Sequence, residues 1–232
     1  MKKYPIRHRV ERTGNKHSRA VFRDDTIVIR LAKGLSADEE KEHISDLLER
    51  MTRQVVEEQE KTLIHPFGRL LDSGESTTIT LQNGQKYRFS LRPGNKTTIK
   101  RTASGWTVTI GPKMRRQGLH RLLWKTLCKQ ELSRIEKLVR TINTETFGVH
   151  ISTVKLQFAS SQWGSCSPSG VIMLNAALLF VTPDVLRYVI IHELAHRKRA
   201  DHSAQYWAWV EWALPAYERI RRKLYDYRLP TL

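Results

Sequence analysis

The stretch His192-Glu193-Leu194-Ala195-His196, followed by Asp201-His202-Ser203, is the most informative part of this sequence. Residues i and i+4 of a helix share one face, so His192 and His196 can present two imidazoles to one metal ion. Glu193 can reach a water at that ion without being a ligand. His202 is the natural third ligand, because three protein ligands plus water is the pattern of a catalytic zinc site. The pattern predicts metal ligands His192, His196 and His202, with Glu193 as the base.

The residues before this motif predict a buried helix. Thr182-Pro183-Asp184 can open it, since the missing N–H of proline costs little in a first turn. The residues from Val185 to Ala195 are apolar nearly all round, as in a core helix. Histidine nitrogens buried there would be costly unless something binds them. The alternative, two ordinary histidines near a helix surface with one paired to Glu193, fits this apolar setting less well.

The composition of the whole chain narrows the class of protein. Its 232 residues permit one large or two small domains, and a hydrophobic content of 40% suffices for a core. The two cysteines, Cys128 and Cys166, give no disulfide framework, which suits a reducing compartment. The basic N-terminus is not followed by an apolar stretch, and no run of about 18 apolar residues occurs. We therefore expect no signal peptide, no contact with a membrane and a cytoplasmic location.

The net charge of +17 is concentrated in one segment. Residues 76–144 carry 15 basic and 2 acidic side chains, a balance of +13. Within it, Arg121, Lys125 and Lys129 recur at helical spacing as a basic ladder. Such a field attracts nucleic acid, nucleotides or acidic proteins. A solvated basic face with no partner explains it equally well.

Local signals predict the elements of the first half. Short strands are expected over residues 5–33, and Ser36-Ala37-Asp38-Glu39 is a capping box that starts a helix running to about residue 61. Residues 76–111 are expected to form a β-meander, with a hairpin at Asn83-Gly84. A long helix is expected over 117–143.

The second half is expected to hold the chemistry. We expect strands over 154–158 and 171–174, the second ending at Asn175, with a tight loop over 161–167 between them. A sheet beside the metal helix could hold an extended substrate as an added edge strand. The predicted fold is α+β: a β-rich N-terminal half, a long middle helix and a catalytic half with its HExxH helix packed on a small sheet. The predicted domains are a β-rich region with one amphipathic helix, 1–112, and a catalytic domain, 113–232.

Several sequence blocks, in the same order, resemble the YgjP-like family of metal-dependent hydrolases, small zincins related to the SprT and WLM groups. The blocks are Trp163-Gly164-Ser165-Cys166-Ser167, Leu174-Asn175, Tyr188 to His196, His202-Ser203 and Tyr206-Trp207. The resemblance is strong over about 150–215 and agrees only in outline elsewhere. It implies a zincin-type catalytic half, with zinc on the three histidines and Glu193 as base.

Substrate contacts are expected in the same blocks, from Trp163, Gly164, Ser165, Asn175 and Trp207. One departure from the family is Gln162, where an arginine is usual; if that arginine contacts substrate, specificity differs here. The spacing to His202 also matches the metzincins, but Arg199 stands where those enzymes have glycine.

Three functions are consistent with these observations. The first is a zinc-dependent metallopeptidase, although another divalent transition metal could occupy three imidazoles. The second is a metal-dependent phosphoanhydride hydrolase acting on nucleoside triphosphates, which residues 76–144 would clamp; no P-loop is present. The third is a nucleic-acid-associated protein carrying a zincin domain, with non-specific contacts through the same basic segment.

Overall fold

The computed structural model describes residues 6–230, which divide into two compact units between Thr62 and Leu63. Each unit has its own hydrophobic core. Among the described residues, no helix combines the length and the apolar character needed to cross a membrane.

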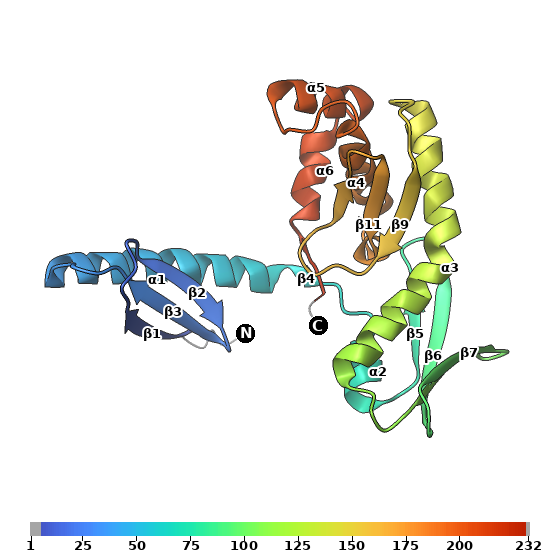
Figure 1. The fold of residues 1–232 in the computed structure, drawn as a ribbon, viewed down its shortest axis with the longest axis horizontal. Helices are drawn as coiled ribbons and strands as arrows, with labels where there is room; N and C mark the ends of the chain where they lie inside the picture. The colour runs from blue at the N-terminus through green and yellow to red at the C-terminus, as the bar shows by residue number, and fades with distance from the viewer. Residues whose placement is uncertain (1–5, 231–232) are drawn as a thin grey trace. The chain divides into compact units, whose positions relative to one another are not determined.

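The first unit is a three-stranded sheet covered by a long helix. The central strand β3 (Thr26–Leu31) pairs in parallel with β1 (Arg7–Arg12) and antiparallel with β2 (Arg19–Arg23). Helix α1 (Ala37–Glu60) lies against β2 and β3 (Figure 1). The core forms because alternate residues of β3 face α1, which contributes an apolar stripe: Ile27, Ile29 and Leu31 against Ile44, Leu47, Leu48 and Met51.

The start of α1 follows directly from its capping box. The Ser36 Oγ accepts a hydrogen bond from the Glu39 backbone N–H, and the Glu39 carboxylate accepts one from the Ser36 backbone N–H. These reciprocal bonds satisfy donors that a helix N-terminus leaves free. The capping box predicted from the sequence is therefore present.

The second unit begins with short elements and a four-stranded sheet. The order of the strands is β5-β6-β8-β7, and β6 pairs with β8 in parallel, so the expected meander is not formed. The alternation of apolar and polar residues predicts where a strand lies but not which strand pairs with it. Strands β7 and β8 form a hairpin, and β8, with its buried Val108, is the member of the hairpin that lies beside β6. The elements are β4 (Thr62–Leu63), α2 (Gly68–Ser73), β5 (Thr77–Thr80), β6 (Lys86–Pro93), β7 (Thr98–Thr102) and β8 (Gly105–Ile110).

The rest of this unit surrounds helix α4 (Pro183–Ala195), which carries the HExxH motif. The long helix α3 (Arg116–Glu145) contacts strand β9 (Thr153–Gln157) and α4 (Figure 1). Strand β11 (Val171–Asn175) pairs with β9 in parallel and with β10 (Gly164–Cys166) antiparallel. The remaining elements are the 3-10 helix η1 (Ala176–Phe180), helices α5 (Ala204–Ala213) and α6 (Tyr217–Leu224), and strand β12 (Tyr227–Arg228), which pairs with β4.

Helix α4 packs on β10 and β11, with its apolar residues in the core of the unit. This confirms the predicted α+β class with the HExxH helix on a small sheet. The predicted division at 112/113 falls inside the second unit, because one core joins Phe89 and Val108 of the four-stranded sheet to Trp124, Leu174 and Ile191.

Candidate metal centre and active site

Helix α4 delivers two of the three histidines. It begins after Thr182 with Pro183 in the first turn, is buried along most of its length, and ends at Ala195, so that His196 is its C-cap. The chain then turns at once: the backbone N–H groups of Lys198 and Arg199 both donate to the Ala195 carbonyl. This sharp turn lets the segment after α4 fold back toward His192.

The segment that carries His202 is held by Asp201. Its carboxylate accepts hydrogen bonds from the Ser203 backbone N–H at 3.1 Å and from Arg199 Nε. The neighbouring Ser203, and then the bond from Arg199, lower the pKa of Asp201 to about 2. Asp201 is therefore ionised at neutral pH and fixes the turn between α4 and α5.

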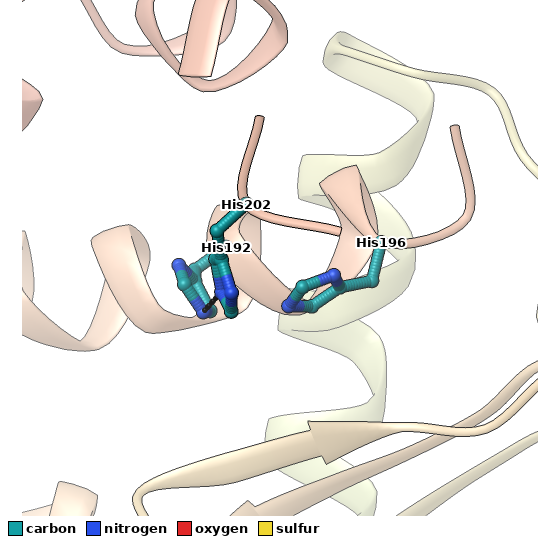
Figure 2. A group of neighbouring side chains, drawn as sticks. All are labelled: His192, His196 and His202. Atoms are coloured by element: carbon teal, nitrogen blue, oxygen red, sulfur yellow. Dashed lines mark hydrogen bonds between the residues drawn. The ribbon is translucent and has the colours of Figure 1, made fainter. Parts of the chain in front are cut away.

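The three imidazoles converge on one point (Figure 2), with their candidate ligand nitrogens all within 4.8 Å of one another. The Nε2 atoms of His192 and His202 are 3.4 Å apart. His196 Nδ1 lies 3.3 Å from the Arg199 carbonyl oxygen, to which it can donate, leaving Nε2 of His196 for the common point. The buried Nδ1 of His192 has no partner among the described residues, so the interactions of this ring lie at Nε2.

The surroundings keep the rings of His192 and His196 neutral. Burial, and then the neighbouring charges of His196 and His202, lower the pKa of His192 to about 3. The pKa of His196 is lowered too, first by burial and then by His202. Neutral imidazoles are the form that binds metal. Three imidazole nitrogens directed at one point are the donor set that a divalent transition metal prefers, so these residues fit such a metal.

Glu193 is the carboxylate beside this cluster, and its residue is 5% exposed. Burial raises the pKa of its carboxyl to about 8. Its side chain packs against Gly164 of β10, so closely that a β-carbon there would lie 2.5 Å from Glu193 Oε1. The glycine therefore makes room for the carboxylate.

Two cavities, of about 630 Å³ and about 560 Å³, meet at the histidine cluster and share Gly164, His192, Glu193 and His202 in their walls. The larger, which we call the hairpin cavity, is also lined by the β10–β11 hairpin and by Arg197 and Lys198. The smaller, which we call the aromatic cavity, is also lined by Trp163, Tyr188, Val189, Trp207, Arg221, Leu224 and Tyr225. An extended molecule can therefore pass the cluster with one part in each cavity.

The structure brings four of the five expected substrate-contacting residues to these walls. Trp163 and Trp207 line the aromatic cavity, Ser165 lines the hairpin cavity, and Gly164 lines both.

Asn175 lies elsewhere, fully buried behind the cavity wall. Its Nδ2 donates to the carbonyl oxygens of Ala159 and Gln162, at 2.7 and 2.8 Å, and its Oδ1 accepts from the Ala177 N–H at 3.0 Å. With its amide group fully engaged, Asn175 holds the 159–163 loop in place and does not line either cavity.

The sequence did not predict the residues that α6 brings to the site or the three cations of the cavity walls, Arg197, Lys198 and Arg221. Arg221 and the C-cap residue Tyr225 belong to an amphipathic helix that carries no motif, so nothing in the sequence pointed to them. Arg197 follows His196 directly and donates from Nη1 to the carbonyl oxygens of Ser167 and Pro168, at 3.2 and 2.7 Å. Its place just after a metal-binding pattern was the one signal that could have drawn attention to it.

A comparison with protein-family models agrees with these features. The model of the YgjP-like family, described as a YgjP-like metallopeptidase domain, matches residues 16–227, which confirms the resemblance. Among solved structures, the chain is similar to the metallopeptidase zymogen abylysin of Pyrococcus abyssi. The two are 26% identical, the match covers 41% of this chain and 99% of that chain, and the TM-score is 0.33. No protein with curated annotation matches the chain.

Proposed function

This chain belongs to the YgjP-like metallopeptidase family and is a metal-dependent hydrolase; from this premise we propose that it is a zinc-dependent peptidase with Glu193 as general base. One observation carries the proposal. Three imidazole nitrogens, of His192, His196 and His202, are directed at one point beside a single buried carboxylate, where two cavities meet.

Zinc is the metal that this donor set fits best. Three protein ligands leave a coordination position open, which distinguishes catalytic from structural zinc sites. Zinc held there would supply a Lewis acid that polarises a peptide carbonyl and acidifies water. Cobalt, nickel or copper could bind the same nitrogens.

Glu193 is placed to move the protons of the reaction. A general base works best with a pKa near the operating pH, and burial has already brought this carboxyl to about 8. A divalent cation nearby favours the ionised form and brings the pKa down again. In this proposal, Glu193 takes a proton from the attacking water and returns it to the leaving amine.

An extended polypeptide is the substrate that suits the walls. Strand β10 is an edge strand of its sheet, paired on one side with β11. A peptide added along its other side would be held by backbone hydrogen bonds. Gly164 and Ser165 of β10 would bind its main chain, while Trp163 and Trp207 would contact side chains in the aromatic cavity.

No observation at the site favours the other two functions. Both were predicted from the charge of residues 76–144, and none of the described residues that line the two cavities belongs to that segment. Nucleotide hydrolysis and nucleic-acid contact stay predictions from the sequence alone.

The test compares zinc content and hydrolysis of an unfolded protein substrate in four variants. Glu193→Gln should keep its zinc and lose activity by roughly 100- to 10,000-fold, the usual contribution of general acid–base catalysis. His202→Ala should lose the zinc. The matched controls are Glu211→Gln, at an exposed position of α5, and His150→Ala, at an exposed position; neither residue lines a cavity.

Both controls should retain zinc and activity. Full activity in Glu193→Gln would disprove the role of this carboxylate. A nucleoside-triphosphate panel assayed alongside decides the second function: phosphate release that disappears in Glu193→Gln, with no proteolysis, would replace the peptidase by a phosphoanhydride hydrolase.

A further inference from the structure

The aromatic cavity contains an arginine for which the proposed peptidase chemistry gives no role. Among the described residues that line it, the charged side chains are Glu193 and Arg221, which come from different helices, α4 and α6. The other lining residues are the two histidines of the cluster, His192 and His202, and residues without an ionised side chain at neutral pH. A substrate group placed in this cavity therefore meets a cation close to the metal-binding cluster.

Aromatic side chains hold the Arg221 guanidinium in place. Its Cζ lies 4.8 Å from the centre of the Trp207 ring, a cation–π contact. Trp207 is itself stacked on Tyr217, with ring centroids 5.5 Å apart and an interplanar angle of 17°. Nη2 of Arg221 also reaches the Tyr225 hydroxyl oxygen at 3.4 Å. These contacts orient the guanidinium without neutralising it.

No carboxylate within residues 6–230 pairs with Arg221, although fourteen ion pairs form elsewhere in that range. The cations of the hairpin cavity, Arg197 and Lys198, also have no carboxylate partner among the described residues, but Arg197 is fixed by the two carbonyl oxygens to which it donates. Lys198 lies over the Trp209 ring, and its ammonium lacks the planar fork of an arginine. An arginine held over an aromatic ring still has N–H groups that can donate to a ligand. These groups match the two oxygens of a carboxylate.

We propose that Arg221 binds a carboxylate of the substrate beside the scissile bond and makes this protein selective for peptides that carry one there. The carboxylate is either the free C-terminus of the peptide or the side chain of an aspartate or glutamate, and both have the same fork-shaped geometry. Trp163 and Trp207 form the apolar walls beside it. This inference rests on the proposed peptidase function and adds a substrate class to it.

The test uses matched peptides and the zinc-loaded full chain. The reference peptide is neutral and blocked at both ends. A second peptide has a free C-terminal carboxylate in place of the amide. Two mixtures of blocked peptides complete the set: in one a glutamate, and in the other a glutamine, replaces each interior residue in turn. Activity is measured as kcat/KM relative to the reference, and binding is measured by calorimetry with the inactive Glu193→Gln chain.

We expect the wild type to prefer carboxylate peptides by roughly 10- to 100-fold, the range of a charge-assisted hydrogen bond. If the preference disappears when the C-terminus is amidated, the bound carboxylate is the C-terminus of the peptide. If glutamate peptides are preferred over glutamine peptides, the bound carboxylate is a side chain. In Arg221→Gln the ratio should fall toward one. Arg221→Lys keeps the charge but not the fork and should retain only part of it.

The control is Arg222→Gln, which removes the same charge from the next residue of α6, outside both cavities. It should keep the wild-type ratio. Equal cleavage and equal binding of carboxylate and neutral peptides by the wild type would overturn the inference while leaving the peptidase intact. So would an Arg221→Gln variant that slows all peptides by the same factor, because the arginine would then act on the reacting group itself.

Failure of the proposed function has a different signature. If no peptide is cleaved at all, the peptidase proposal is wrong, and binding to the Glu193→Gln chain still decides the role of Arg221. Tighter binding of carboxylate peptides that Arg221→Gln abolishes supports a carboxylate site, and indifference to the carboxylate refutes it.

Discussion

Replacing Gly164 with alanine should slow peptide hydrolysis by about 100-fold while leaving the metal in place. The added β-carbon would lie 2.5 Å from Glu193 Oε1, 2.8 Å from Cγ and 2.9 Å from Cδ. Ordinary contacts begin at about 3.4 Å, so the carboxylate has to move by roughly 0.9 Å. The clash includes Cγ as well as the carboxylate, so rotation of the carboxylate alone does not relieve it.

The size of the effect follows from that displacement. Misplacing a catalytic group by about 1 Å can cost about 100-fold in rate, equivalent to about 2.7 kcal/mol of barrier. The three closest contacts of the added β-carbon are all with Glu193, so the metal should stay bound. The loss should therefore appear in kcat, with KM changing little.

The assay measures kcat and KM for a peptide together with zinc content and thermal unfolding. The matched control is Gly14→Ala, because a β-carbon at Gly14 meets nothing within 4 Å. An unchanged kcat in Gly164→Ala would refute the argument that Glu193 needs this space. Loss of zinc in proportion to activity would refute it as well, since the damage would then lie in the metal site.

Three further predictions concern stability. His120 should contribute about 3 kcal/mol to the free energy of unfolding, and this contribution should be lost between pH 6.5 and 4, because burial, then the charges of His65 and Arg116, lower its pKa to about 4. As the pH falls, the unfolded chain takes up this proton first, so the full contribution of His120 is present above pH 6.5. Denaturant unfolding of the wild type and of His120→Gln should show free energies of unfolding that change differently with pH. Equal changes would contradict this assignment. Asn175→Ala should lower the free energy of unfolding by roughly 3 kcal/mol, since three buried main-chain groups lose their partner; a loss under about 1 kcal/mol in thermal or chemical unfolding would show that the loop finds other partners. Zinc at 100 times its Kd should stabilise the metal-free protein by about 2.7 kcal/mol; a melting shift that persists in His202→Ala would mean that zinc binds elsewhere.

The features that the sequence predicted well are those with local causes. The capping box at Ser36 and the turn at Gly84, whose φ of 84° favours glycine, each depend on a few neighbouring residues. The convergence of His192 and His196 depends on helical periodicity alone. The α+β class follows from the same kind of signal, because strand-like and helix-like segments are well separated along the chain.

The features that the sequence did not predict depend on contacts between distant residues. Strand β10 has three residues, including Gly164, and so lacks the alternation that marks a strand. The parallel pairing of β6 with β8 is a choice between partners that local patterns do not encode. Arg221 reaches the aromatic cavity only because α6 folds back beside α4, and these two helices are in contact.

The shared core of the second unit also determines how small a working piece of this chain can be. A fragment that begins at residue 113 would keep all three histidines, but it would lose Phe89 and Val108, which are completely buried in the same core as Trp124. Without these partners the apolar face of α3 would be open to water, and such a fragment should aggregate or unfold. The shortest C-terminal portion that should fold around its histidines therefore begins near residue 63, where the second unit starts.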